Sequence, residues 1–266
     1  MIFDAHIHLD LYPDVDAEAI VRDPDLTGLI AVSMDLASAG RTLELKRRFP
    51  DKVRAACGIH PERPPEDVCT GDVSALERFI REHAGEIDAI GEVGLPYYTR
   101  REVMQSTGGW NEAPYLDMLD RMLELAAELD KPVILHGVRE DVRVLLDRLE
   151  AHRIRRAHFH WLKTDDRTLE RLVSMGFMVS FTPDILYEEE TCRVAERVPL
   201  ELLMAETDGP WEFEGPFAGR KTHPSMIRES VRHLAKRRGI KPAVLLERLA
   251  ENAKTFIDGT RETGIS

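Results

Sequence analysis

The sequence predicts an α/β protein built as a single (β/α)8 barrel, with residues 1–266 forming one domain. Short apolar runs alternate with longer amphipathic runs from one end of the chain to the other. The apolar runs are dense in hydrophobic residues instead of strictly alternating, which is typical of parallel strands that are buried on both faces. No Pro/Gly/Ser-rich linker interrupts the 266 residues, and this length is usual for one eight-unit barrel.

Eight runs have the length and apolar density of buried strands. They cover residues 2–8, 28–35, 53–60, 88–95, 131–137, 155–162, 177–183 and 201–208. Repeated strand-then-helix units predict that these strands lie parallel to one another in one sheet.

Amphipathic runs with helical periodicity fill most of the intervals between the strands. We predict helices over residues 41–49, 73–84, 115–129, 142–152 and 167–176, and after the last strand over 225–239 and 243–257. The stretch from Pro96 to Pro114 lacks this periodicity, and we predict a long irregular loop there, on the rim of the active site.

Charge and cysteine content restrict the class of protein. The formal charge is −12, from 36 Lys and Arg against 48 Asp and Glu, so a broad basic surface that coats nucleic acid or anionic membrane is disfavoured. Cys57, Cys69 and Cys192 are odd in number and far apart, which indicates a reducing compartment. With no signal peptide and no transmembrane run in the sequence, we expect a cytoplasmic protein without a membrane partner.

Metal-ligand residues gather at the ends of the predicted strands. The candidates are His6, His8, His60, Glu92, His136, His160 and Asp208. In an eight-unit barrel the carboxyl ends of all strands converge on one face, where barrel enzymes keep their active sites. Residues far apart in sequence are therefore expected to meet in one pocket.

The types and spacing of these residues suggest metal chemistry. His6 and His8 are two apart on a strand, so both side chains point to the same face. Histidine nitrogen with carboxylate oxygen suits Zn²⁺, Mn²⁺, Fe²⁺ or Co²⁺ better than Mg²⁺. The six candidates on strands 1, 4, 5, 6 and 8 are too many for one tetrahedral ion and about right for two ions that share a carboxylate. Spacing alone leaves His158 as a competitor of His160.

Two aspartates near the strand ends have alternative interpretations. Asp10 and Asp35 could reach the rim of the site, although an aspartate after a strand more often caps a helix or forms a turn.

Several segments carry a resemblance to a known family. They are FDAHIHLD at the start, CGIHP at 57–61, AIGEVGLPYY at 89–98, KPVILH at 131–136, FHW at 159–161, VPLELLMAETDGP at 198–210 and ENAKTF at 251–256. With these motifs in this order, the chain resembles the TatD family of metal-dependent hydrolases, which is similar to the amidohydrolase barrels. The resemblance implies a TIM barrel, a dinuclear metal site and a deoxyribonuclease, typically a 3′ to 5′ exonuclease, with Mg²⁺ supporting turnover.

The resemblance also implies roles for individual residues. His6, His8 and Asp208 would bind one ion and His136 and His160 the other, with Glu92 as the bridge. His160, and not His158, would then be the ligand, and His60 would bind substrate at the scissile phosphate. Glu92 and Asp208 are the predicted catalytic residues, and Asp208 would orient the attacking water and accept its proton.

The chain departs from the family pattern around the substrate. Pro96 stands where similar proteins usually have Asp, Gly137–Asp141 replaces a Ser/Thr-Arg-Asp-Ala-like stretch, and residues 219–224 read Gly-Arg-Lys-Thr-His-Pro in place of an Asn-Glu-Pro-like segment. The resemblance therefore supports metal binding more firmly than it supports DNA as the substrate.

Three functions follow from these observations. A nuclease or phosphodiesterase acting on DNA or a small phosphodiester comes first, a hydrolase of an amide, lactone or other ester second, and a catalytically silent metal-binding barrel third. No obligate protein partner is inferred. Five cations follow strands and could contact phosphates, although each is more simply a solvated surface charge. They are Arg100, Arg101, Lys163, Arg220 and Lys221.

Overall fold

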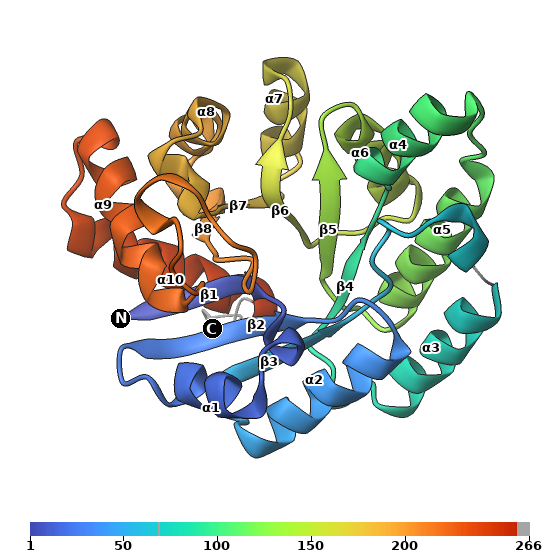
Figure 1. Ribbon diagram of the computed structural model, residues 1–266, viewed down its shortest axis with the longest axis horizontal. Coiled ribbons are helices and arrows are strands. Elements are labelled where there is room, and N and C mark those ends of the chain that lie inside the picture. The colour runs from blue at the N-terminus through green and yellow to red at the C-terminus, as the bar shows by residue number, and fades with distance from the viewer. Residues whose placement is uncertain (69, 260–266) are drawn as a thin grey trace, which may run out of the picture.

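Parallel strands in sequential order form the central sheet of the computed structural model, which describes residues 1–68 and 70–259 (Figure 1). Within those residues the sheet has eight strands, and every neighbouring pair from β1–β2 to β7–β8 is parallel. They are β1 (Ile2–Ile7), β2 (Leu26–Val32), β3 (Val53–Cys57), β4 (Ala89–Gly94), β5 (Val133–Val138), β6 (Ala157–Lys163), β7 (Met178–Phe181) and β8 (Leu203–Ala205). The predicted (β/α)8 barrel is confirmed.

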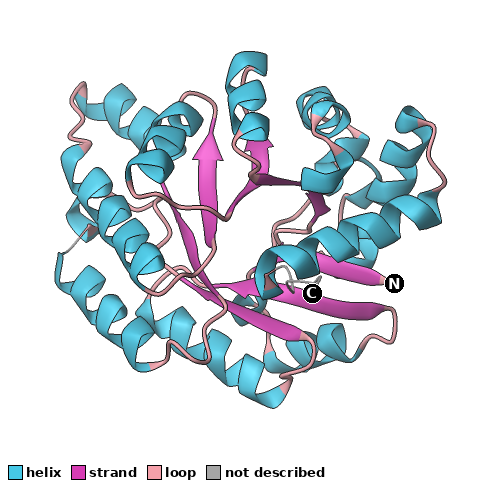
Figure 2. Ribbon diagram, turned by 180° about the vertical axis from the view of Figure 1, so that it is seen from behind, coloured by secondary structure: helices cyan, strands magenta, loops and turns pink. Residues whose placement is uncertain are grey.

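Helices surround the sheet on its outer side (Figure 2). They are α1 (Asp14–Arg22), α2 (Leu36–Arg48), α3 (Thr70–Glu82), α4 (Tyr97–Thr107), α5 (Ala113–Glu128), α6 (Asp141–Ala151), α7 (Asp166–Ser174), α8 (Glu189–Arg197), α9 (Ile227–Arg238) and α10 (Pro242–Asp258). The sequence did not predict α1, α4 or α8. The prediction of an irregular loop over residues 96–114 is wrong, because residues 97–107 form α4.

Burial explains why the strands are apolar on both faces. Every residue of β1, β4 and β5 is buried, as are all residues of β2 except one. The larger cluster of apolar side chains packs between the strands and the surrounding helices. A second cluster, which includes Phe3, Ile30 and Ile134, packs inside the barrel. The sheet is therefore a filled core, and it presents only its ends to solvent.

Backbone hydrogen bonds join β1 to the segment that follows β8. The amide of Asp208 donates to the carbonyl of His6 at 2.9 Å, and the amide of His8 donates to the carbonyl of Gly209 at 2.8 Å. Asn252 on α10 donates through Nδ2 to the carbonyls of Leu200 and Leu203, which fixes the final helix against β8. These contacts place the first and last predicted ligands side by side.

The remaining predictions about organisation fit the structure only in part. The single domain predicted over 1–266 includes residues 260–266, and one of the three cysteines is residue 69, all outside the described residues. Cys57 and Cys192 are free thiols. None of the described helices combines the length and the apolar composition needed to cross a bilayer. The cytoplasmic location stays a prediction.

Candidate metal centre

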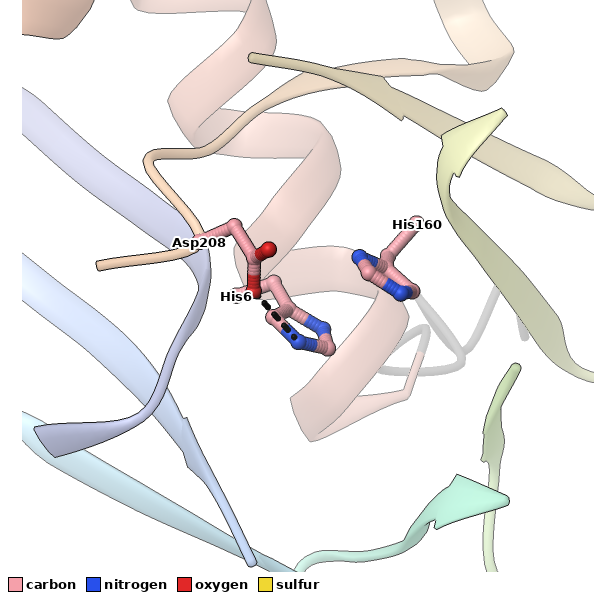
Figure 3. A group of neighbouring side chains, drawn as sticks. All are labelled: His6, His160 and Asp208. Atoms are coloured by element: carbon pink, nitrogen blue, oxygen red, sulfur yellow. Dashed lines mark ion pairs between the residues drawn. The ribbon is translucent and has the colours of Figure 1, made fainter. Parts of the chain in front are cut away.

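The side chains predicted for the site come together at the carboxyl ends of the strands. They are His6 on β1 and His8 directly after it, His60 after β3, Glu92 on β4, His136 on β5, His160 on β6 and Asp208 after β8. Figure 3 shows three of them: His6 points toward the Asp208 carboxylate, and the His160 ring lies beside His6. The His6 and His160 rings are stacked, with centroids 3.9 Å apart.

Glu92 lies between two groups of histidines and turns one carboxylate oxygen to each. Its Oε2 is 3.1 Å from His6 Nε2 and 3.4 Å from His8 Nε2. Both nitrogens are also 3.4 to 3.5 Å from Asp208 Oδ1. These four side chains form the first cluster.

The other oxygen of Glu92 belongs to a second cluster. Glu92 Oε1 is 2.7 Å from His160 Nε2 and 3.0 Å from His136 Nδ1, and those two nitrogens are 3.4 Å apart. Glu92 is completely buried on β4, so strand geometry and not a flexible loop sets where its two oxygens lie. A single carboxylate that faces two ligand sets is the arrangement expected of a bridging ligand.

The donor atoms of the first cluster fit a cation. His6 Nε2, Glu92 Oε2 and Asp208 Oδ1 are buried, and none of them has a hydrogen-bond partner. Buried polar atoms are normally paired, so three that converge without hydrogen bonds need another explanation. Two sets of donor atoms that include His6 are close enough to hold an ion, one with His8 and Glu92 and one with His160 and Asp208. Nitrogen and carboxylate donors at this spacing suit a divalent transition ion.

Opposing charges set the protonation of the cluster. Burial raises the pKa of Glu92, but the positively charged rings of His160 and His6 and the hydrogen bond with His136 outweigh burial and hold that pKa well below its usual range. Burial and His160 lower the pKa of His6, whereas Glu92 and Asp208 raise it, to about 9 overall. The carboxylates are therefore ionised and attract cationic charge, which a metal ion can supply in place of protons.

His60 differs from the other histidines in how its ring is held. The backbone amide of Glu62 donates to His60 Nδ1 at 3.2 Å, so the neutral ring carries its proton on Nε2. That Nε2 lies 3.4 Å from Glu92 Oε1, and burial lowers the pKa of His60. His60 therefore presents a neutral N–H donor to the centre, which suits contact with a substrate oxygen.

The structure separates His160 from its competitor His158. His158 Nε2 is 2.6 Å from Ser180 Oγ, inside the barrel, whereas His160 contacts Glu92. Asp35 caps α2 by accepting a hydrogen bond from the Ser38 amide at 2.8 Å. Asp10 belongs to none of the ligand groups found among the described residues.

A family model and known proteins match the chain along most of its length. The family described as "TatD related DNase" matches residues 3–258. The chain belongs to the TatD family. A TatD homolog from Escherichia coli K12, YJJV, has a similar crystal structure, with a TM-score of 0.82 at 24% identity, covering 97% of this chain and 98% of that one.

Relatives in the TatD family are named as hydrolases. A metal-dependent hydrolase from Haemophilus influenzae is 40% identical over 215 residues, which are 81% of this chain and 83% of the relative. A Danio rerio protein, tatdn3, whose name proposes a deoxyribonuclease, is 26% identical over 261 residues, 94% of each chain. This TatD protein is accordingly a metal-dependent hydrolase.

The five rim cations of this TatD chain are already engaged with other side chains. The pairs are Arg100 with Glu112 and Asp141, Arg101 with the Tyr97 hydroxyl, Lys163 with Asp184, Arg220 with Glu229, and Lys221 with Asp16. Arg100 is the least exposed of them, and it links α4 to Asp141 at the start of α6 and to Glu112 at the N-cap of α5. Their observed contacts are therefore structural ion pairs and hydrogen bonds.

Sequence reasoning missed two carboxylates that support the site. Glu206 is buried, 3.5 Å from His160 Nδ1, and accepts hydrogen bonds from the Trp161 amide and the Ser180 hydroxyl. Its spacing of two from Asp208 was a usable signal. Glu62 contacts His136 Nε2 at 3.2 Å. Burial raises the pKa of Glu62, but the hydrogen bonds from His136 and Thr99 lower it to about 2, and no sequence pattern indicated this contact.

Proposed function

We propose that this chain is a dinuclear metal-dependent phosphodiesterase that removes nucleotides from DNA ends in the 3′ to 5′ direction. The observation that carries the proposal is the division of Glu92, whose Oε2 faces His6 and His8 and whose Oε1 faces His136 and His160. Membership in a family described as TatD related DNase supports DNA as the substrate.

Each side chain takes a role from its position. His6, His8 and Asp208 would hold one divalent ion, His136 and His160 the other, and Glu92 both. When bound, such a pair of ions activates water as a nucleophile and neutralises the charge that develops on the leaving oxygen. Zn²⁺, Mn²⁺, Fe²⁺ and Co²⁺ match the donors, and Mg²⁺ can support turnover through the carboxylates.

The protein groups then move protons and position the phosphate. The Asp208 carboxylate faces the first cluster, where it would orient the attacking water and accept its proton. His60 would donate its Nε2–H to a phosphate oxygen, because its Nδ1 is already occupied by the Glu62 amide. Glu92 keeps the two clusters at a fixed separation while the phosphate binds.

One observation favours a second candidate, the hydrolysis of a small amide, lactone or carboxylic ester. Each of the five rim cations has a partner in the described part of the chain, so none of these five is held in reserve for a polyanion. The same dinuclear chemistry acts on carbonyl substrates.

A substrate panel separates the two candidates. The metal-loaded protein would be assayed on 3′-labelled single-stranded DNA, on 5′-labelled DNA, on bis-p-nitrophenyl phosphate, and on a set of esters, lactones and amides. We expect stepwise loss from the 3′ end together with cleavage of bis-p-nitrophenyl phosphate. Efficient turnover of a carbonyl substrate without any phosphodiester cleavage would overturn the proposal in favour of the second candidate.

A further inference from the structure

Helix α4 starts beside the metal centre without a cap of its own. Its N-cap residue is Pro96, which makes no side-chain hydrogen bond to the helix. The first amides of a helix have no partner within the helix and normally bond to an Asp, Asn, Ser or Thr at the N-cap. Proline has no acceptor in its side chain, so the acceptor must come from outside the N-cap residue.

Glu62, which follows β3, provides that acceptor from a different part of the chain. The Tyr98 amide donates to Glu62 Oε1 at 2.9 Å, and the Thr99 amide donates to Oε2 at 2.7 Å. Both oxygens of one carboxylate thus bond to adjacent amides in the first turn of α4. A negative charge at this end of a helix also interacts favourably with the helix dipole.

The same carboxylate reaches the second cluster. Glu62 Oε1 lies 3.2 Å from His136 Nε2, while the opposite nitrogen of that ring, Nδ1, lies 3.0 Å from Glu92 Oε1. A proton on Nε2 leaves the Nδ1 lone pair free to face the cluster. In metal sites, a carboxylate behind a histidine fixes the tautomer and the ring orientation and makes the histidine a better ligand.

The first cluster has no equivalent support. His6 Nδ1 and His8 Nδ1 are buried without a hydrogen-bond partner in the described part of the chain. A change at Glu62 should therefore affect ions bound through His136 and leave ions bound through His6 and His8 largely unaffected.

We propose that Glu62 is a positioning residue that caps α4 from outside the helix and orients His136. Binding of an ion by the second cluster and ordering of the first turn of α4 then depend on each other. The inference rests on the two-ion site of the proposed function. Glu62 orients a ligand of that site, and the experiments below measure ion binding and hydrogen exchange without DNA.

Ion affinity tests the contact with His136. Zn²⁺ would be titrated in competition with a chromophoric chelator into the wild type, Glu62→Gln, and the control Glu66→Gln, which removes an exposed charge from the same loop. We expect Glu62→Gln to weaken one of two ions by about 10- to 100-fold, and Glu66→Gln to weaken neither. Equal affinities for all three proteins, or a wild type that binds no ion, would overturn the proposal.

A double-mutant cycle identifies which ion is affected. In a His8→Asn background the loss caused by Glu62→Gln should persist, whereas in a His160→Asn background, which disables the second cluster, it should disappear. A loss of the same size in both backgrounds would mean that Glu62 acts through general stability and not through His136.

Hydrogen exchange tests the cap. Glu62→Ala should speed exchange of the α4 amides, and adding Pro96→Asp, which places a capping carboxylate at the N-cap, should slow it again without restoring the lost ion affinity. Zn²⁺ should slow α4 exchange in the wild type and not in Glu62→Ala/Pro96→Asp. Two results would contradict the inference. One is an α4 amide exchange rate in Glu62→Ala equal to that of the wild type. The other is slowing of α4 exchange by Zn²⁺ in Glu62→Ala/Pro96→Asp to the same extent as in the wild type. A protein that shows these effects but does not cleave DNA would refute only the proposed function.

Discussion

Individual residues in the centre have conformations that match their proposed chemistry. Asp208 has a φ of +48°, in the left-handed region that aspartate and asparagine enter more readily than other residues with side chains. The backbone bonds between Asp208, His6 and their neighbours hold it there. Its carboxylate is therefore aimed at His6 and His8 by the main chain and not by side-chain packing alone.

Asp208→Asn is expected to abolish turnover while the fold survives. Asparagine keeps the shape and tolerates the same φ, but it cannot accept a proton from water, so kcat should fall by at least about 10³-fold. The measurement is kcat on the best substrate of the panel, with circular dichroism and the thermal midpoint as controls. Turnover at the wild-type rate would refute the proposed role of Asp208.

The buried thiols provide a pH-dependent prediction. Burial raises the pKa of Cys57 to about 12 and also raises that of Cys192. A raised pKa keeps the thiol protonated, so the reactive thiolate of Cys57 is only about 10⁻⁴ of the total at pH 8.

In a Cys69→Ser variant, a disulfide reagent should label the thiols of Cys57 and Cys192 slowly at pH 8 in the native protein. In the urea-unfolded protein the same thiols should be labelled rapidly. The labelling rate should increase about tenfold for each unit of pH. Rapid labelling of Cys57 in the native state at pH 8 would contradict the burial of this thiol.

At the scale of strands and helices, close approach between β4 and β5 sets the spacing of the ligands. Gly94 pairs with His136, and a Cβ on Gly94 would lie 2.0 Å from the His136 carbonyl oxygen. Only glycine therefore allows these strands to bring Glu92 and His136 within 3.0 Å.

Gly94→Ala is expected to separate the two strands, lower the free energy of unfolding by about 2 kcal/mol and weaken the ion bound through His136. The control is Gly40→Ala on α2, where a Cβ meets nothing within 4 Å and should stabilise the protein by up to about 1 kcal/mol. Urea unfolding and Zn²⁺ titration measure both effects. Full ion affinity in Gly94→Ala would show that this close approach does not set the ligand spacing.

Elements were predictable where periodicity was strong, and the errors have physical causes. The eight strands are mostly buried and rich in apolar residues, so their positions are visible in the sequence. Helix α4 was not predicted because its sequence, YYTRREVMQST, buries only Tyr97 and gives no apolar stripe. Its start depends on Glu62, which lies 36 residues before Tyr98 in the chain, a contact that no local pattern encodes.

The same distinction applies to the candidate site. Residues at strand ends could be predicted because barrel topology brings those ends together. The two-residue spacing of His158 and His160 could not tell which one faces Glu92, since both point to the same side of β6. Position along the strand decides this: His158 lies two residues further from the carboxyl end of β6, where it pairs with Met178 on β7 and its ring contacts the Ser180 hydroxyl.

For the molecule as a whole, the charge of −12 and the paired rim cations predict a weak dependence on salt. Each phosphate contact on a single strand contributes about 0.7 to the slope of log affinity against log salt. One or two contacts at the centre should therefore give a slope between about −0.7 and about −1.4.

The test is KM for a single-stranded oligonucleotide between low and physiological salt at fixed free metal. A slope several times steeper would mean that the strand is bound along an extended basic track, which the observed pairing of the five cations does not provide.

The closure of the barrel between β1 and the segment after β8 also concerns how the protein is made. A ribosome releases His6 and His8 first and Asp208 some two hundred residues later, and Glu92, His136 and His160 emerge between them. Until Asp208 is synthesised and its backbone bonds to His6, the first cluster lacks one of its four side chains. With the two-ion site proposed above, we therefore expect the first ion to be bound with its full ligand set only after the segment that carries Asp208 has been synthesised.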